Sequence, residues 1–376
     1  MKLSIFSFFS GAGFLDLGFE KTGFEVVYAN EIHPPFNYTY KYSREQLKLP
    51  KPRYGYHEGD IKELIEDEGQ DSLRTLVNSC KNNNETVGFI GGPPCPDFSV
   101  GGKNRGREGE NGKLSATYVE LICQQKPDFF LFENVKGLWR TKKHRAFYDH
   151  MKDVLHNSGY VTTDRLINAL EYGAPQDRAR IILIGFKQSL LEELNIPFGK
   201  DMAIPDRGFP WEKHIKYSIA DIFELPWPTV EPFEPNTEKI CPIGLPEELT
   251  VQHWFEKNEV DKHPNANQYF TPRAGLKRFE TVDEGDSSKK SYKRLHRWRY
   301  SPTACYGNNE VHLHPYKARR ISVAEALAIQ SLPKEYVVPP NLTLSNAFKT
   351  VGNGVPFMAS KGIAETIRDF LGGDDL

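Results

Sequence analysis

The stretch LSIFSFFSGAGFLDLGFE, residues 3–20, decides the fold of this chain. Residues 3–9 are a short β-prone run, and residues 14–20 carry apolar side chains at helical spacing. The intervening residues 10–13, SGAG, have the composition of a tight turn. A strand, a glycine turn and a helix in this order predict the first βα unit of a parallel sheet.

Further apolar runs predict the rest of this sheet and the helices that cover it. The expected strands are residues 26–30, 87–90, 129–132 and 181–185; the expected helices are residues 114–125, a segment that opens with the capping box Ser322–Glu325 and stops before Pro333, and residues 357–370. Because strands alternate with helices at this spacing, we expect an α/β fold with a doubly wound, mostly parallel sheet.

After about residue 187 the composition changes. Residues 188–300 are rich in Pro, Trp, Glu and Asn and lack the regular alternation of strand and helix. We therefore expect a second, smaller, loop-rich domain there, with regular structure returning near Arg320. The sequence contains no internal repeat that would indicate a solenoid.

The overall composition is that of a globular protein with a substantial core. The chain has 376 residues, of which 39% are hydrophobic, and it contains no window of about 18 uninterrupted apolar residues. Its N-terminus lacks the basic, apolar and small-residue pattern of a secretory signal. We therefore expect a soluble cytoplasmic protein that does not bind membranes.

The cysteines exclude several kinds of site. Five cysteines stand at positions 80, 95, 123, 241 and 305, and none forms a CxxC pair. No zinc site or redox dithiol is therefore predicted, and the odd, scattered set argues against a disulfide framework.

Charge is distributed unevenly although the net charge is only −2. Residues 289–299 contain six Lys or Arg in eleven positions, with two aromatic residues interleaved. Smaller basic clusters lie at 103–107, 142–145 and 319–320, while acidic residues collect elsewhere. Such segregation favours a basic cleft that faces phosphates, and a merely solvated surface is the alternative for each run alone.

The first turn carries half of a dinucleotide-binding fingerprint. Gly11 and Gly13 allow close backbone approach, and Glu31 ends the next strand 20 residues after Gly11, where a carboxylate can accept ribose hydroxyls. Asp16 occupies the place of the third glycine, so the site suits a nucleoside-like ligand without a pyrophosphate, such as S-adenosylmethionine. Asp60 is either a further carboxylate for the adenine amine or a solvated loop acid.

Cys95 lies in GGPPCPDFS, residues 91–99, directly after the expected strand 87–90. A lone cysteine is most often an inert buried residue. Here prolines stiffen the loop, and open α/β sheets bind ligands at the carboxyl ends of their strands. Glu133 ends the next strand, so a thiol and a carboxylate can face one pocket, a pair suited to nucleophilic attack on an electron-poor ring.

Two other segments each allow more than one interpretation from the sequence alone. Residues 100–113 carry five glycines and four basic residues, which suits a phosphate-seeking lid or a disordered surface loop. Arg178 and Arg180 alternate before a strand, so they can share one face and donate to a base oxygen or a phosphate, or form surface ion pairs.

Taken in chain order, these blocks resemble the bacterial-type DNA (cytosine-5) methyltransferase family, which depends on S-adenosylmethionine. The resemblance runs through FSGAG at 9–13, Asn30-Glu31, Asp60-Ile61, GPPC at 92–95, ENV at 133–135, Gln176-x-Arg178-x-Arg180, the segment from Arg320 to Pro333 with Glu325 and Gln330, and GNGVP at 352–356. It covers nearly the whole chain except residues 188–300, where the family is expected to vary most.

The resemblance implies a catalytic role for four residues. Cys95 would add as a thiolate to C6 of a cytosine, and Glu133 would engage N3 and the exocyclic amine. Arg180 would hold the base oxygen O2, with Arg178 supporting it. C5 would then take the methyl group, leaving S-adenosyl-L-homocysteine as product. Because C6 is inaccessible inside a duplex, the cytosine would have to be flipped out.

The resemblance also implies binding residues. The cofactor contacts carried over by position are Phe9, Gly11, Gly13, Glu31, Ile32, Asp60, Ile61, Pro94, Leu114, Asn353 and Val355. The lid at 99–114 would close over the DNA with Ser99 on a phosphate, and the expected DNA contacts are Ser99, Lys103, Arg105, Arg107, Lys293, Arg294, Arg297, Arg299 and Thr303.

The implied domain organisation is discontinuous. Residues 1–187 would form the catalytic and cofactor-binding domain, residues 188–300 a target-recognition domain, and residues 301–376 a return segment that completes the cofactor pocket. Two positions depart from the family pattern. Pro96 stands where many relatives have Gln, and Phe14 replaces a frequent glycine, which is expected to tighten the methionine end of the pocket.

The implied partner is double-stranded DNA. We also expect a cognate restriction endonuclease encoded nearby, without a physical complex, and a monomer that works at the nucleoid. Two alternatives remain at this point: a cytosine-5 methyltransferase of transfer RNA, and a non-catalytic DNA-binding repressor. The presence of Cys95, Glu133 and Arg180 argues against the repressor, and no stretch before the first strand can hold a helix-turn-helix.

Overall fold

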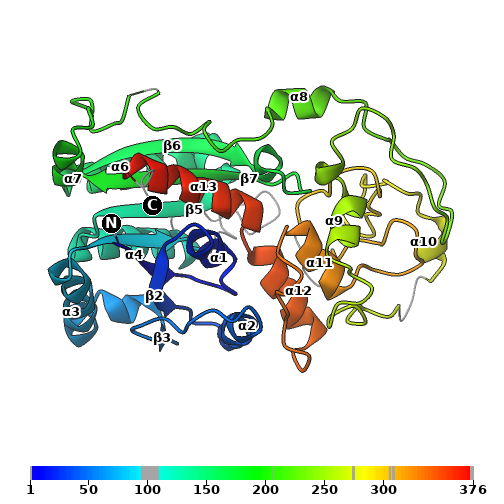
Figure 1. Cartoon of the computed structure of the whole chain (residues 1–376), viewed down its shortest axis with the longest axis horizontal. Coiled ribbons are helices and arrows are strands. Elements are labelled where there is room, and N and C mark those ends of the chain that lie inside the picture. Colours follow the sequence, from blue (N-terminus) through cyan, green and yellow to red (C-terminus); the bar gives the residue numbers. More distant parts are fainter. Residues whose placement is uncertain are drawn as a thin grey trace.

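The computed structural model describes residues 2–94, 110–205, 207–272, 276–304, 306 and 310–372. Among these residues, seven strands form one sheet in the order β3-β2-β1-β4-β5-β7-β6 (Figure 1). The strands are β1 (Lys2–Phe8), β2 (Glu25–Asn30), β3 (Tyr56–His57), β4 (Glu85–Gly91), β5 (Phe129–Val135), β6 (Tyr160–Asn168) and β7 (Ala179–Lys187).

The sheet is mostly parallel, as predicted. The pairs β1–β2, β1–β4, β2–β3 and β4–β5 are parallel, whereas β7 runs antiparallel to both β5 and β6. The sequence predicted the strand at 181–185 but not its direction. The reversal places the start of β7 beside the end of β5, where Val135 pairs with Arg180.

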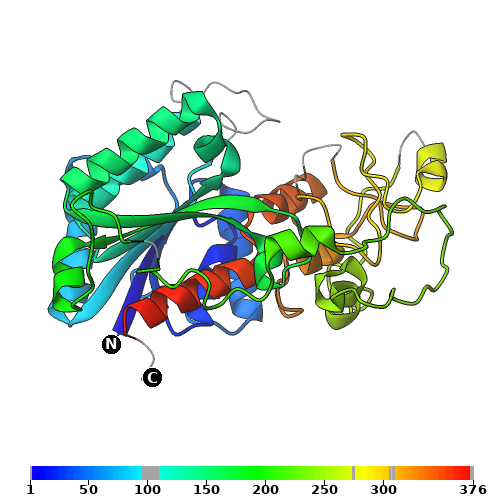
Figure 2. The same ribbon diagram turned by 90° about the horizontal axis from the view of Figure 1, so that it is seen from above.

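Helices cover both faces of the sheet, which is the doubly wound arrangement (Figure 2). One face packs against α1 (Phe14–Glu20), α7 (Gln188–Glu193) and α13 (Phe357–Phe370). The other face packs against α3 (Asp67–Asn82), α4 (Glu110–Gln125), α5 (Lys136–Arg140) and α6 (Lys142–Asn157).

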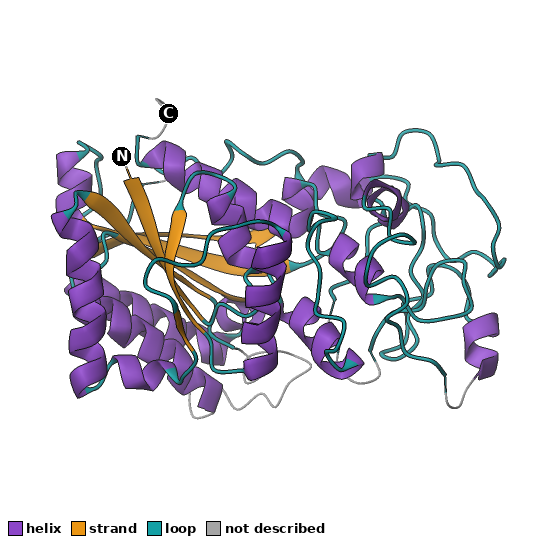
Figure 3. Cartoon of the chain, turned by 60° about the horizontal axis from the view of Figure 1, so that its bottom comes forward, coloured by secondary structure: helices purple, strands orange, loops and turns teal. Residues whose placement is uncertain are grey.

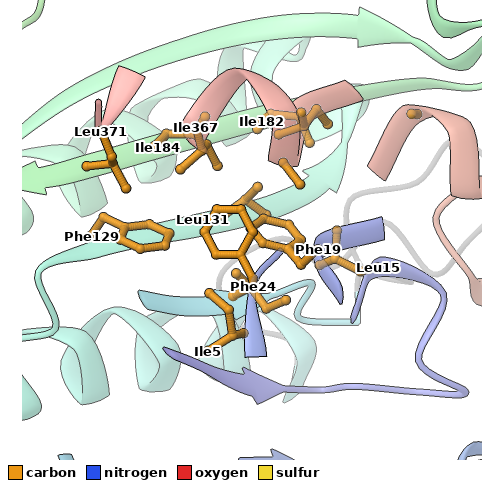
Figure 4. Close-up of a cluster of buried hydrophobic side chains, with 14 of the residues drawn as sticks. Ile5, Leu15, Phe19, Phe24, Phe129, Leu131, Ile182, Ile184, Ile367 and Leu371 are labelled. Atoms are coloured by element: carbon orange, nitrogen blue, oxygen red, sulfur yellow. The ribbon is translucent and has the colours of Figure 1, made fainter. Parts of the chain in front are cut away.

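The alternation of side chains along each strand explains the two cores. On β1, Leu3 and Ile5 enter the first core, whereas Phe6 and Phe8 enter the second. Successive side chains of a strand point to opposite faces, and a strand buried on both faces is apolar at nearly every position. Figure 4 shows the first core, where Ile5 and its neighbours on other strands meet α1 and α13.

The last helix lies where the return segment was expected. The prediction of a helix at 357–370 is confirmed, and the capping box formed by Ser322 and Glu325 is present at the start of α11 (Val323–Ile329). Ile363 and Ile367 of α13 pack into the first core, and Ser360 Oγ donates to the Leu15 carbonyl of α1 at 2.5 Å. The two ends of the chain therefore meet on one face of the sheet.

The region after β7 has long loops and short helices, as Figure 3 shows. Its described helices besides α7, α11 and α13 are α8 (Ile219–Glu224), η4 (Glu247–Leu249), α9 (Val251–Lys257), α10 (Leu276–Thr281) and α12 (Leu344–Asn353). Before β7, the helices not yet named are α2 (Pro34–Gln46), η1 (Ile61–Leu64) and η3 (Ala169–Tyr172). Ile204 and Phe209 pack into the first core against the sheet, so this part of residues 188–300 covers the catalytic half. The domain boundary at 188 stays a prediction.

A third core joins the loop-rich region to the sheet half. It combines apolar residues of α9, α11 and α12 with Ala12, Phe14 and Leu17 of the glycine turn and α1. The glycine turn is therefore held from the side opposite the sheet. In the described part of the chain, no helix has the length and apolar character needed to span a membrane.

Candidate active site

Glu133 and Arg180 form the centre of the site. Glu133 lies near the carboxyl end of β5, and its Oε1 forms an ion pair with Arg180 Nε at 2.9 Å. Their side chains are only 12% and 15% exposed, so the ion pair is largely shielded from water. The antiparallel pairing of β5 with β7 brings these two residues together.

The loop after β4 passes directly against Glu133. A Cβ on Gly92 would lie 2.7 Å from Glu133 Oε2, so only a glycine leaves room for this carboxylate. Asn134 Nδ2 lies 3.5 Å from the Pro93 carbonyl, at the limit of a hydrogen bond, and Pro94 is exposed. One carboxylate oxygen thus binds Arg180 and the other faces the segment that leads to Cys95.

Cys95 itself lies outside the described residues. The same holds for the other predicted residues of the lid, which are Ser99, Lys103, Arg105 and Arg107.

Arg178 is placed differently from Arg180. It is buried, and its Nη1 donates to the Ala304 carbonyl at 3.3 Å. The neighbouring Gln176 accepts from Ala304 N at 3.0 Å, and Thr303 Oγ1 donates to the Asp177 carbonyl at 2.6 Å. Arg178 therefore fastens the start of β7 to the segment at 301–304, while Arg180 reaches the carboxylate.

Glu31 lies directly after β2 and turns its carboxylate toward the glycine turn. Its Oε2 accepts from Gly11 N at 2.9 Å, and its Oε1 accepts from His33 N at 2.7 Å. Burial raises the pKa of Glu31, and the backbone N–H groups of His33 and Gly11 oppose that shift. Each oxygen has one acceptor lone pair left for a ligand hydroxyl.

Several predicted cofactor residues surround Glu31. Ile32 is 59% exposed, an unusual state for a large apolar residue. Phe9 adopts φ 51° and turns its ring edge-on to Tyr118, with centroids 6.0 Å apart. Gly13, at φ 78°, leaves room for the Tyr40 ring, which a Cβ would approach to 2.5 Å.

The segment after β3 lies beside the end of β2. Asp60 caps η1 by accepting from Lys62 N at 3.1 Å, and Ile61 is buried. Asn30, to which the sequence analysis assigned no role, donates to the Gly59 carbonyl at 2.9 Å. Its place directly before Glu31 was the only indication of a role, and it holds the Asp60 segment beside β2.

The remaining residues predicted to contact the cofactor lie on the return segment and on α4. Asn353 is exposed at the end of α12, Val355 is buried, and Leu114 on α4 is half-buried. A Cβ on Gly354 would lie 1.9 Å from the Phe14 ring, so the large residue at position 14 fits because position 354 has no side chain.

Tyr336 is a further residue that the sequence did not reveal. It is buried, and its hydroxyl donates to the Ala12 carbonyl of the glycine turn at 2.7 Å. Its ring also packs edge-on against Phe14 with centroids 5.1 Å apart. The return segment therefore holds the glycine turn in place through Tyr336.

The prediction of DNA contacts by Arg294 and Arg297 is wrong. Arg294 is 1% exposed, and its guanidinium donates to the carbonyls of Val282, His314 and Phe279. Burial lowers the pKa of Arg294 to about 10. These donors are already used inside the protein, so they are not free for a phosphate.

Arg297 is likewise internal. It is 2% exposed, and its Nε and Nη2 donate to Glu284 at 2.8 and 2.9 Å. Lys293 and Arg299 are half-buried, and Arg299 Nη1 donates to the Pro228 carbonyl at 3.3 Å. DNA contacts by Lys293, Arg299 and Thr303 stay predictions.

Comparison with known proteins identifies the family of the chain. The family model of C-5 cytosine-specific DNA methylases matches residues 3–369. The chain belongs to this family. It is therefore a DNA (cytosine-5-)-methyltransferase that acts on DNA, and membership implies S-adenosylmethionine as the methyl donor.

Curated relatives match along almost the full chain. The Type II methyltransferase M.NmeDI of Neisseria meningitidis serogroup C is 58% identical over 370 residues, which cover 98% of this chain and 84% of the relative. M.FnuDI of Fusobacterium nucleatum is 29% identical and covers 98% and 96% of the two chains.

Solved structures share the fold. A structure described as a DNA modification methyltransferase encoded within an E. coli prophage matches with a TM-score of 0.65 and 21% identity, covering 99% of this chain and 100% of its own. The S. pombe Dnmt2 methyltransferase matches with a TM-score of 0.59 and 14% identity over the full length of both chains.

Proposed function

We propose that this enzyme methylates C5 of a cytosine flipped out of a specific duplex DNA sequence, through a covalent bond between Cys95 and C6. The observation that carries the proposal is the 2.9 Å contact between Glu133 and Arg180 beside the segment that leads to Cys95. A carboxylate and a guanidinium in one shielded site match the hydrogen-bonding edge of cytosine, which offers N3, an exocyclic amine and O2.

The chemistry requires the base to leave the helix. Atoms C5 and C6 lie within the base stack of a duplex, so an enzyme that attacks them must extrude the nucleotide at a cost of about a few kcal/mol. The carboxyl edge of β4 and β5 is where an extruded base would meet both Glu133 and the loop that carries Cys95.

The proposed reaction forms and later breaks a bond between the Cys95 sulfur and C6 of the cytosine. The Cys95 thiolate donates its electron pair to C6, and the C5–C6 π electrons shift toward C5 while Glu133 in its acid form donates a proton to N3. Glu133 takes this proton back when the ring is restored. C5 becomes nucleophilic and forms the new carbon–carbon bond to a methyl group. The methyl–sulfur bond of the donor would break, and its electron pair would leave with S-adenosyl-L-homocysteine. A base then removes the C5 proton, and that electron pair re-forms the double bond as the C6–sulfur bond breaks and Cys95 returns as a thiolate.

Arg180 and Arg178 have different roles in holding the base. Arg180 Nη2 has no partner among the described residues, so after binding Glu133 through Nε it retains donors for the base oxygen. Arg178 acts behind it, by fixing the start of β7 to Ala304. We infer that Arg180 touches the base and that Arg178 positions Arg180.

The residues around Glu31 fit an adenosine-like cofactor. The Glu31 carboxylate keeps acceptor capacity for two ribose hydroxyls, and the exposed Ile32 offers an apolar surface next to it. Phe9, Gly11, Gly13, Asp60, Ile61, Pro94, Leu114, Asn353 and Val355 would line the rest of this site. When bound, S-adenosylmethionine supplies an electrophilic methyl group.

We further propose a role in restriction-modification. Relatives at 58% and 29% identity are named Type II methyltransferases, and such enzymes are modification partners of endonucleases. On this proposal residues 188–300 select the target sequence, a cognate endonuclease is encoded nearby without a physical complex, and the enzyme works as a monomer on the cell's DNA.

Two measurements test the proposal together. Labelled methyl transfer from S-adenosylmethionine should reach duplex DNA and not transfer RNA, and bisulfite sequencing of DNA from cells expressing the protein should show methylcytosine in one sequence context. Label on transfer RNA alone would contradict the choice of substrate. Methylation spread over all cytosines would contradict the role of a recognition domain.

A further inference from the structure

The segment that follows Glu133 is strongly basic and contains no acid. Residues 134–148 carry five cations and no Asp or Glu, and the first acid is Asp149. The cations are Lys136, Arg140, Lys142, Lys143 and Arg145. This is a different segment from the basic run at 289–299.

Three of these cations are free to bind a ligand. Lys136, Arg140 and Lys142 are exposed, and none has an acidic partner in the described part of the chain. Arg145 differs, because its Nε donates to Asp149 at 2.8 Å and its guanidinium lies 5.2 Å from the Trp139 ring. We call Lys136 and Arg140 of α5, together with Lys142 at the start of the following helix α6, the α5 cations.

The fold places the α5 cations at the catalytic edge. Helix α5 begins at the residue directly after β5, three residues beyond Glu133, and it packs against β7, which carries Arg180. The loop that leads to Cys95 leaves the adjacent parallel strand β4 at the same edge. DNA whose cytosine reaches Glu133 must therefore bring its backbone close to α5.

The basic run at 289–299 offers fewer free cations than its composition suggests. Arg294 and Arg297 are internal, and Lys290 pairs with Glu310 at 3.3 Å. Exposed, unpaired cations beside the site are what phosphate binding requires, since each contact gains free energy by releasing a counterion.

We propose that Lys136, Arg140 and Lys142 bind phosphates of the target duplex and hold it over Glu133. The proposal rests on the proposed function. Phosphate contacts carry no sequence information, so the α5 cations supply the sequence-independent part of the affinity. Target selection is a separate property of other residues.

The test compares two charge-matched variants. The first neutralises the α5 cations as K136Q, R140Q and K142Q together. The second, K21Q with K51Q and K126Q, removes three exposed lysines that precede β2, β3 and β5, at the opposite edge of the sheet. Binding to a labelled poly(dA-dT) duplex, which contains no cytosine, is measured without cofactor over a range of salt concentrations.

The α5 variant should bind this duplex about 10- to 100-fold more weakly at low salt, and the slope of log affinity against log salt should become shallower by about three. The control variant should keep the wild-type slope. R140Q alone, which changes one surface residue, should lower the slope by about one. Thermal unfolding checks that each variant is folded.

An α5 variant whose affinity and slope equal those of the control overturns the inference. The result is separable from that of the proposed function, because binding to a cytosine-free duplex needs no methyl transfer. A wild-type protein that binds this duplex with the expected slope but methylates no DNA overturns the function alone. A wild-type enzyme that methylates DNA while the α5 substitutions leave the slope unchanged overturns this inference alone.

Discussion

Two arginine–glutamate pairs in this molecule show the same chemistry put to different uses. Arg180 and Glu133 meet at 2.9 Å at the edge of the sheet, each retaining about an eighth of its side-chain exposure. Arg297 and Glu284 meet at 2.8 Å in the loop-rich region with almost none. The first pair keeps oxygen and nitrogen atoms free for a ligand, whereas the second uses them to hold loops together.

Charge in a sequence therefore does not specify exposure. The run at 289–299 has the composition of a nucleic-acid-binding segment, yet two of its arginines tie loops together from inside. A loop-rich region with few strands has many carbonyls that need donors, and buried guanidinium groups provide them. Substitutions in the two pairs and around them test whether the Arg180–Glu133 pair serves catalysis and the Arg297–Glu284 pair serves stability.

Removing the charge of Glu133 should abolish most of the activity and little of the stability. In E133Q the ring nitrogen of cytosine loses its carboxylate partner, and we expect kcat to fall by about 10²- to 10⁴-fold. Single-turnover methyl transfer to duplex DNA measures this change. A matched control is E120Q on the exposed face of α4. Equal rates for the two variants would contradict a chemical role for Glu133.

Removing the charge of Glu284 should have the opposite effect. E284Q leaves the Arg297 guanidinium buried without its counter-ion, and breaking such a pair costs about 3–5 kcal/mol of unfolding free energy. Denaturant unfolding measures the loss, with the exposed E280Q as control. If E284Q were as stable as E280Q, Arg297 would not depend on this partner and the structural role would fail.

Adding one methyl group at Gly92 should move the Glu133 carboxylate without changing its charge. In G92A the new Cβ displaces Glu133 Oε2, which lies 2.7 Å from that point, and a misplaced catalytic group costs about 10- to 100-fold in rate. The unfolding free energy should change little, because a flexible carboxylate end can move aside. Steady-state kinetics and thermal unfolding of the same sample check both parts. Wild-type kinetics in G92A would show that Oε2 does not need its observed position.

Acid should weaken the loop-rich region before the sheet. Burial lowers the pKa of His312 to about 3, with Lys293 and Arg320 adding to the shift. Above the ordinary histidine pKa of about 6.5, His312 is neutral in both the folded and the unfolded chain. As pH falls from about 6.5 toward 3, the unfolded chain takes up a proton first, so the free energy of unfolding decreases. We expect His312 to lower the free energy of unfolding by up to about 1.4 kcal/mol per pH unit in this range.

Urea unfolding at several pH values measures this slope, and H312Q should reduce it. An unchanged slope in H312Q would assign the acid sensitivity to other groups. His296 and His314, whose pKa values burial also lowers, are the natural next substitutions.

The parts of the fold that the sequence predicted correctly depend on local patterns. The strand–turn–helix at 3–20, the capping box at Ser322 and the helix α13 follow from periodicity and capping, which neighbouring residues determine. The direction of β7 was not predictable in this way. A strand has the same alternation in either direction, and only its pairing with β5 and β6 fixes the choice.

The residues of the site also differ in whether neighbouring residues or distant contacts determine their roles. Glu133, Arg180 and Glu31 were predicted because each stands at a strand end in a recognisable block. Tyr336 and the internal Arg294 were not, because their roles depend on carbonyls far away in the chain, such as Ala12 and Phe279. Long-range contacts of this kind leave no periodic pattern in a single sequence.

The central claim is that Cys95 forms a covalent bond with the base that Glu133 and Arg180 hold. Incubation with S-adenosylmethionine and duplex DNA containing 5-fluorocytosine tests it, because fluorine at C5 blocks the final elimination. The wild-type protein should form a denaturant-resistant complex with the DNA, and C95A should form none. If the two proteins behave alike, the covalent account is contradicted.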